Sequence, residues 1–197
     1  MKKGLIIGLS IVGVIILIIM WGVGIYNNIV KLDEGVNSAW AQVENQYQRR
    51  MDLIPNLVET VKGYANFEKS TLEGVIEARA KATQITLSPE LLNNPQAFRQ
   101  FEQTQGQLSS ALSRLLVTVE QYPNLKANEN FLQLQSQLEG TENRISVERK
   151  RFNEVVQSYN QTIRTIPTNM IAGFGGFREK QYFQAQTGAE NPPKVQF

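Results

Sequence analysis

The strongest candidates for a functional site in this chain form one polar cluster within an otherwise apolar helical pattern. They are Arg49, Arg50 and Asp52. Arg50 occupies a position that neighbouring turns fill with apolar residues. Its guanidinium is therefore expected to point into a helical bundle, where it needs a carboxylate partner. The candidates are Glu142 and Glu148 on a later helical stretch, and Glu148 itself occupies an apolar-seam position. Such a pair typically sets the register of a bundle; the alternative is a ligand site built on the same cluster.

The composition removes the usual catalytic groups. The 197 residues include no histidine and no cysteine, so the commonest general base, thiolate chemistry and disulfides are excluded. The di-metal site of four-helix bundles needs Glu-x-x-His motifs, which cannot form without histidine. The glycines of 173–176 lack the lysine and the flanking strand of a phosphate-binding loop. We therefore expect no enzyme, no cofactor and no metal; an enzyme built on the Arg/Glu cluster is the least favoured alternative.

The charge of the chain is balanced beyond its first residues. Lysine and arginine number 20 against 18 aspartates and glutamates, and Lys2 with Lys3 accounts for the excess. A neutral body has no electrostatic attraction to DNA or RNA, so no nucleic-acid partner is expected. The basic run Arg149–Arg151 is predicted to be a solvated helix face, with anionic lipid headgroups as the alternative contact.

Residues 5–25 have the length and composition of a membrane anchor. The stretch carries no charge, and as a helix it would rise about 31 Å, near the thickness of a bilayer's hydrocarbon core. Lys2 and Lys3 precede it, while Trp21 and Tyr26 lie at its far end, where amphipathic rings prefer the interface. A cleavable signal peptide is the alternative, but its apolar run is only about 7–15 residues long.

The orientation of this anchor is predicted from the flanking charges. Two lysines precede the span, and Lys31 is the one basic residue between it and Arg49. The positive-inside rule therefore favours a cytoplasmic N-terminus and an extracytoplasmic body.

The remainder of the chain predicts an all-α fold. Apolar residues recur every three or four positions over four stretches, 36–64, 68–84, 98–122 and 128–166. Pro55 in the first stretch lacks an N–H and crowds the Met51 carbonyl, so we expect a kink or a break there. The sequence leaves open whether the first two stretches are one helix or two. Long helices joined by short loops pack antiparallel, so an antiparallel bundle of about four coiled-coil-like helices is predicted.

Prolines mark the boundaries of these helices. Ser88–Pro89 and Asn94–Pro95 match the pattern of helix starts, and a short turn of helix is expected between them. Pro123 and Pro167 are expected to end the third and fourth stretches.

The C-terminal residues change in character. The stretch 174–177 is predicted to be flexible, 180–183 to dock an aromatic pair on the bundle, and 184–197 to be an unstructured tail. The aromatic residues predicted to contact lipid or a second copy are Phe174, Phe177, Tyr182 and Phe183. The expected domains are thus a transmembrane anchor (1–26), a helical bundle (27–183) and a flexible tail (184–197).

Several motifs of the chain closely resemble the LemA family. They are Ala39-Trp40 with Val43, Arg49-Arg50-Met51-Asp52-Leu53-Ile54-Pro55-Asn56-Leu57-Val58, Val61-Lys62-Gly63-Tyr64-Ala65, Glu77-Ala78-Arg79, Glu120 with Tyr122-Pro123 and Leu125, Leu138 with Thr141-Glu142-Asn143-Arg144-Ile145, and Tyr159-Asn160 with Ile163 and Pro167. The resemblance covers nearly the whole chain from Tyr26 to Phe183. It implies a bacterial inner (cytoplasmic) membrane protein with one N-terminal span and an antiparallel helical bundle. It implies no enzymatic activity, and it suggests association with other membrane proteins such as envelope proteases.

Two functions follow from these expectations. The first is a non-enzymatic, membrane-anchored scaffold or assembly protein whose bundle self-associates or binds partners. A homo-oligomer is expected because confinement in a membrane raises the effective concentration. The alternative is an envelope-stress or membrane-remodelling protein that contacts lipid directly through the bundle or residues 174–183.

Overall fold

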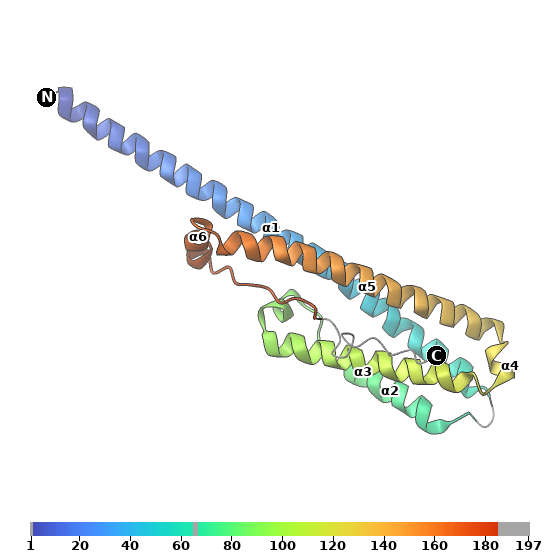
Figure 1. The fold of residues 1–197 in the computed structure, drawn as a ribbon. Coiled ribbons are helices and arrows are strands. Elements are labelled where there is room, and N and C mark those ends of the chain that lie inside the picture. Colours follow the sequence, from blue (N-terminus) through green and yellow to red (C-terminus); the bar gives the residue numbers. More distant parts are fainter. Residues whose placement is uncertain (1, 65–66, 185–197) are drawn as a thin grey trace, which may run out of the picture.

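The computed structural model describes residues 2–64 and 67–184, and the fold in these ranges is helical, without a strand. Its elements are α1 (Lys2–Lys62), α2 (Lys69–Thr83), the 3-10 helix η1 (Pro89–Asn93), α3 (Pro95–Val119), α4 (Pro123–Lys126), α5 (Glu129–Arg164) and α6 (Thr168–Gly175). Figure 1 shows the N-terminal half of α1 projecting alone, with the other elements gathered along its second half. The predicted all-α class is therefore confirmed, and most of the predicted tail, from residue 185 on, lies outside the described residues.

Helix α1 joins two dissimilar segments in one continuous helix. Its large apolar side chains from Leu5 to Val23 are exposed, whereas Ile29, Val36 and Trp40 are buried against the rest of the chain. By length and composition, α1 is the one helix among the described residues that could cross a membrane. The helix therefore passes from an apolar rod into the core of a bundle without an intervening linker.

Pro55 lies inside α1, and the helix has no break at this position. Of the expected kink or break, the break is therefore not present. Proline cannot donate to the carbonyl four residues earlier, which leaves the Met51 oxygen without its helical donor. Arg79 of α2 supplies one, since its Nε lies 3.2 Å from the Met51 oxygen. The question left open by the sequence is also answered, because α1 ends at Lys62 and α2 is a separate helix.

The long helices pack in two pairs. Helix α5 lies along the second half of α1, and α2 lies along α3 (Figure 1). Trp40 of α1 contacts Phe152 of α5, with ring centroids 5.6 Å apart. Further along α1, Arg50 contacts Glu142, so residue numbers fall along α5 as they rise along α1.

The helix start predicted at Asn94–Pro95 is confirmed. Asn94 is the N-cap of α3, and its Oδ1 accepts hydrogen bonds from the backbone N–H groups of Gln96 and Ala97, both at 3.1 Å. These bonds satisfy donors that have no partner within the helix. The short helix expected between the two proline motifs is η1, and α5 begins in the same way with Asn128 as its cap.

The buried apolar residues form two clusters. The proximal core, nearer the N-terminal apolar segment, contains the buried apolar side chains of α1 from Ile29 to Tyr47, with residues of η1, α3, α5 and Phe183. The distal core contains those of α1 from Met51 to Val61, with residues of α2, α3, α4 and α5. Position 50 of α1 falls between these two groups, so the side chain that separates the cores is Arg50.

The C-terminal segment differs from the prediction in two respects. The stretch 174–177 is not a flexible linker, because α6 extends to Gly175 and is capped by Gly176. Gly176 has a φ of 74°, a left-handed conformation that glycine adopts without steric penalty. Phe183, predicted to contact lipid or a second copy, is only 6% exposed. Its ring instead completes the proximal core of its own chain, which agrees with the docking predicted for 180–183, although Tyr182 stays 40% exposed.

Candidate functional site

A layer of polar side chains separates the two cores. Arg50 Nη1 donates to Ser109 Oγ at 2.9 Å and to Glu142 Oε1 at 2.7 Å, and its Nη2 donates to Gln105 Oε1. The guanidinium carbon also lies 5.1 Å from the centroid of the Tyr47 ring. Arg50 is only 1% exposed, so one buried cation ties together α1, α3 and α5.

The sequence identified part of this layer. The predicted pair of Arg50 with Glu142 is formed, whereas Arg49 and Asp52 are exposed and take no part in it. Glu148, the other candidate partner, is half-buried, and its Oε2 has no hydrogen-bond partner among the described residues.

Two partners of the buried arginine were missed. Gln105 is the one polar residue in the apolar pattern of the third predicted stretch, and it is buried. The sequence did contain a signal for Gln105. It is a polar residue in an apolar pattern, as Arg50 is on the first stretch, and two such residues on packed helices often pair. Ser109 follows Gln105 by one helical turn and so lies on the same face.

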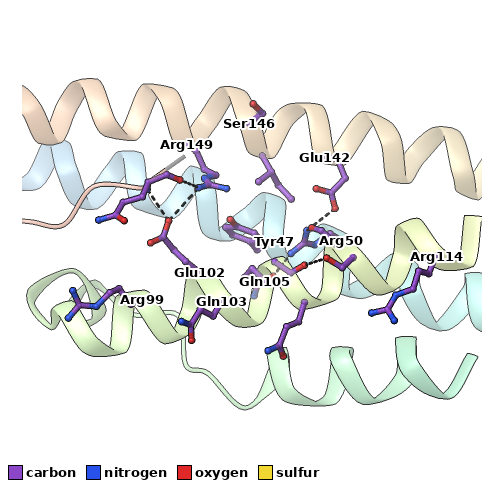
Figure 2. A pocket seen from close by; sticks show the side chains of 16 residues that line it. Tyr47, Arg50, Arg99, Glu102, Gln103, Gln105, Arg114, Glu142, Ser146 and Arg149 are labelled. Atoms are coloured by element: carbon purple, nitrogen blue, oxygen red, sulfur yellow. Dashed lines mark hydrogen bonds and ion pairs between the residues drawn. The ribbon is translucent and has the colours of Figure 1, made fainter. Parts of the chain in front are cut away.

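A groove of about 1130 Å³ lies over the polar layer. Figure 2 shows its walls formed by α3 and α5 and its floor by α1, which contributes Tyr47 and Arg50. Its charged lining residues are Arg50, Arg99, Arg114, Arg149, Glu102 and Glu142. Most of the remaining lining is glutamine and serine, and Ile145 is the one aliphatic side chain. The groove is thus polar, with two more arginines than glutamates.

The end of the described chain closes one side of this groove. The backbone N–H of Gln184 donates to Glu102 Oε1 at 3.0 Å, and its carbonyl accepts from Arg149 Nη2 at 3.0 Å. The Arg149 guanidinium also lies 4.5 Å from the centroid of the Phe183 ring. Burial raises the pKa of the Glu102 carboxyl, although the Gln184 N–H and the Arg149 charge act in the opposite direction.

Two asparagines of α5 bind the backbone just before this point. Asn160 donates from Nδ2 to the Lys180 carbonyl at 3.0 Å and accepts from the Lys180 N–H at 2.9 Å. Asn153 makes the same pair of bonds with Phe183, both at 2.9 Å. The two asparagines are seven residues apart and so lie on one face of α5. The segment 180–184 is therefore held in part through its main chain, in the manner of a bound peptide.

The side chain of Lys180 in this segment is buried among polar groups. Its Nζ lies 3.0 Å from Asp33 Oδ1 and donates to Asn93 Oδ1 at 3.0 Å. The ammonium also lies 5.7 Å from the centroid of the Tyr159 ring. Burial first, and then the nearby Asp33 charge, raise the pKa of the Tyr159 hydroxyl.

The side chains predicted at the membrane interface lie at the start of α1 and near α6. Lys2 begins α1, and Trp21 is 55% exposed. Tyr26 packs edge-on against Phe177, with ring centroids 5.5 Å apart. Helix α6 thus lies against α1 at the end of its apolar segment.

The aromatic residues of the C-terminal segment divide by exposure. Phe174 is 92% exposed and Tyr182 is 40% exposed, while Phe177 is half-buried and Phe183 is buried. Phe174 and Tyr182 therefore remain available for a further contact.

Comparison with known proteins agrees with the motifs in the sequence. The model of the LemA family matches residues 39–197. Magnetosome protein MamQ 2 of Paramagnetospirillum magneticum is 26% identical over 85% of this chain and 67% of its own length. Magnetosome protein MamQ of Magnetospirillum gryphiswaldense shows the same identity and coverage. Protein LemA of Metamycoplasma hominis is 26% identical over 76% of this chain and 64% of its own. The chain therefore spans about two thirds of the length of these relatives.

Proposed function

The chain belongs to the LemA family, and from that premise we propose that it is a non-enzymatic scaffold anchored in a bacterial inner membrane. Residues 5–25 of α1 cross the bilayer, with the N-terminus in the cytoplasm and the bundle outside it. The bundle of antiparallel helices self-associates or binds other membrane proteins.

The observation that carries this proposal is the continuity of α1. The helix contains both the exposed apolar segment and the residues from Ile29 to Val61 that form one side of both cores. Arg50 therefore lies about 37 Å along the helix axis from Ile25, at 1.5 Å per residue. A bundle carried on such a helix is held at a fixed distance from the anchor, which suits a scaffold better than a tethered, freely moving domain.

The chemistry of the groove supports binding rather than catalysis. The sequence contains no histidine or cysteine. The two groove carboxylates, Glu102 and Glu142, each face an arginine. Both carboxylates are therefore already engaged in ion pairs within the chain.

The mass of the full-length chain in a mild detergent tests self-association. The monomer has a mass of 22.3 kDa, so a uniform multiple of that value after subtraction of detergent supports the proposal. A mass of one chain at the highest attainable concentration contradicts self-association and restricts the scaffold to other partners. Repeating the measurement without residues 1–26, after circular dichroism has verified the helical fold, shows whether the anchor or the bundle drives assembly.

Direct contact with lipid is a second candidate function, and one observation favours it. Met170 and Phe174 lie one turn apart on α6 and are 63% and 92% exposed, and Ile166, just before the helix, is 83% exposed. These residues lie beside α1 near the end of its apolar stretch, because α6 packs on α1 and the Ile171 side chain lies next to Gly22. An exposed apolar stripe at that level is suited to the headgroup region of a bilayer.

A further inference from the structure

We propose that the groove between α3 and α5 is a binding site for an extended polypeptide segment that carries carboxylate side chains. The proposal deepens the scaffold function by naming the chemistry of the partner. The proposal rests on the scaffold function in one respect: the bundle must be accessible to other proteins.

The lining of the groove favours an extended ligand over a helical one. A partner helix has satisfied its own backbone hydrogen bonds and docks through an apolar face into an apolar groove. Here Ile145 is the one aliphatic lining residue, and glutamines and serines predominate. Amides and hydroxyls both donate and accept hydrogen bonds, so they suit a strand whose backbone N–H and C=O groups are still free.

The molecule already binds an extended backbone at one end of this groove. Gln184 lines the groove, with its N–H bonded to Glu102 and its C=O bonded to Arg149. The side chains that make these bonds come from the two walls, α3 and α5 (Figure 2). A ligand strand lying further along the groove would contact glutamines and serines of the same walls, such as Gln103, Gln107 and Ser146.

The excess of arginines in the groove favours a ligand with acidic side chains. Arg50 and Arg149 are neutralised by Glu142 and Glu102. Arg99 and Arg114 line the groove, are exposed, and have no acidic partner within the described part of the chain. They are 15 residues apart on α3, which corresponds to about 22 Å. An extended chain covers that distance in about six or seven residues, so carboxylates at this spacing reach both arginines.

The position of the groove disfavours a membrane surface as the ligand. Its floor, Tyr47 and Arg50, lies about 33–37 Å along α1 from the last residue of the apolar segment. Lipid headgroups of the anchoring membrane do not extend that far. Nucleic acid is disfavoured because it carries a phosphate at every nucleotide, whereas Arg99 and Arg114, about 22 Å apart, are the groove arginines without an acidic partner within the described part of the chain.

Peptide binding to the full-length protein tests the proposal. The protein is placed in nanodiscs of zwitterionic phosphatidylcholine, and the probe is a fluorescein-labelled twelve-residue Gly/Ser peptide with two glutamates six residues apart. We expect saturable binding by fluorescence anisotropy, and loss of at least tenfold in affinity when both glutamates are replaced by glutamine. The double variant Arg99→Gln/Arg114→Gln is expected to show a similar loss. Both arginines are exposed, so the fold is not at risk.

The double variant Arg144→Gln/Arg151→Gln is the matched control. These arginines are also exposed, lie on α5 and do not line the groove, so the variant loses the same net charge. It should bind the acidic peptide within twofold of the wild-type affinity.

Three results would overturn the proposal: no binding of the acidic peptide, equal weakening by the control variant, or equally tight binding of a twelve-nucleotide oligothymidylate. If the peptide does not bind but the full-length protein has an oligomeric mass in detergent, the scaffold function is still supported and only the groove proposal is lost. A monomeric mass with specific peptide binding would instead remove self-association and keep the groove.

Discussion

Arg50 of α1 and Glu142 of α5 form an ion pair of 2.7 Å across the bundle, at the level where the apolar core is interrupted. The two side chains differ in burial, since that of Arg50 is 1% exposed and that of Glu142 is 37% exposed. A buried cation depends on its counter-charge, whereas a carboxylate that reaches water can be hydrated when its partner is removed. The pair is therefore asymmetric in its contribution to stability.

This asymmetry predicts different effects of removing either partner. Glu142→Leu leaves the buried guanidinium without a counter-charge and should lower the free energy of unfolding by about 3 kcal/mol. Arg50→Met lets Glu142 be hydrated but leaves the buried Gln105 Oε1 without its donor, so it should cost less, about 1–2 kcal/mol. Urea denaturation followed by circular dichroism measures both. Equal costs for the two variants would show that burial does not decide the effect.

The hydrogen bond from Arg79 to the Met51 carbonyl predicts a coupling between α1 and α2. Arg79→Met leaves a half-buried carbonyl without a donor and should cost about 1–2 kcal/mol. In a Pro55→Ala background, the alanine N–H can donate to that carbonyl, so the same change should cost clearly less. A double-mutant cycle measures the difference as a coupling energy of about 1 kcal/mol. Additive effects would mean that Arg79 does not replace the donor lost at Pro55.

Phe183 and Phe174 provide a matched pair of large-to-small substitutions. Phe183 packs among Trp40, Phe98, Phe101 and Phe152, so Phe183→Ala should cost about 3–5 kcal/mol. It should also change the fluorescence of Trp40, against which the Phe183 ring is stacked. Phe174→Ala, at a residue that is 92% exposed, should leave thermal stability unchanged in detergent. Similar losses for the two variants would contradict the buried position of Phe183.

The buried position of Glu102 predicts a pH dependence of stability. Because burial raises its pKa above 4.5, the folded protein retains this proton to a higher pH than the unfolded chain. The resulting contribution to stability is complete below about pH 4.5 and is lost as the pH rises through the folded pKa. Glu102→Gln is neutral throughout and keeps an oxygen to accept from Gln184. Between pH 4 and pH 7, the unfolding free energy of the wild type should therefore fall relative to that of the variant. A constant difference across this range would contradict the prediction.

The exposed stripe of α6 predicts contact with the bilayer. A Phe174→Trp side chain, in a Trp21→Phe background, should be quenched by brominated lipids in nanodiscs of the full-length protein. The control is the Trp21→Phe variant alone, whose one tryptophan is Trp40. Because Trp40 is buried in the proximal core, its fluorescence should not be quenched. Met170→Ser should reduce the quenching, since it removes an apolar neighbour one turn earlier on the same face. Absence of quenching would remove lipid contact by α6.

The sequence predicted the helices well because their apolar periodicity is long and regular. The third stretch, predicted over 98–122, corresponds to α3 at Pro95–Val119, and the fourth to α5 at Glu129–Arg164. Of the kink or break expected at Pro55, the break does not occur, and the compensating donor, Arg79, comes from a different helix. Local sequence rules for proline cannot include a partner that only tertiary packing supplies.

The site was less predictable than the fold for a similar reason. The pair of Arg50 with Glu142 follows from two polar residues on facing helices, and that pattern is visible in the sequence. The bonds from Asn153 and Asn160 to the C-terminal segment involve backbone groups, which carry no residue-specific signal. Gly176 did hold such a signal, since a glycine after a short helix is typical of a left-handed cap. It marks the end of α6 within the stretch 174–177, which was predicted to be flexible.

The unbroken α1 also gives the molecule a defined reach. From Ile25 to Lys62 the helix extends about 55 Å, and α4 lies near its far end (Figure 1). With the apolar segment in a membrane and the helix upright, the far end of α1 stands at that distance from the membrane. A second surface facing that membrane would be kept at least this distance away, whichever protein occupied the groove.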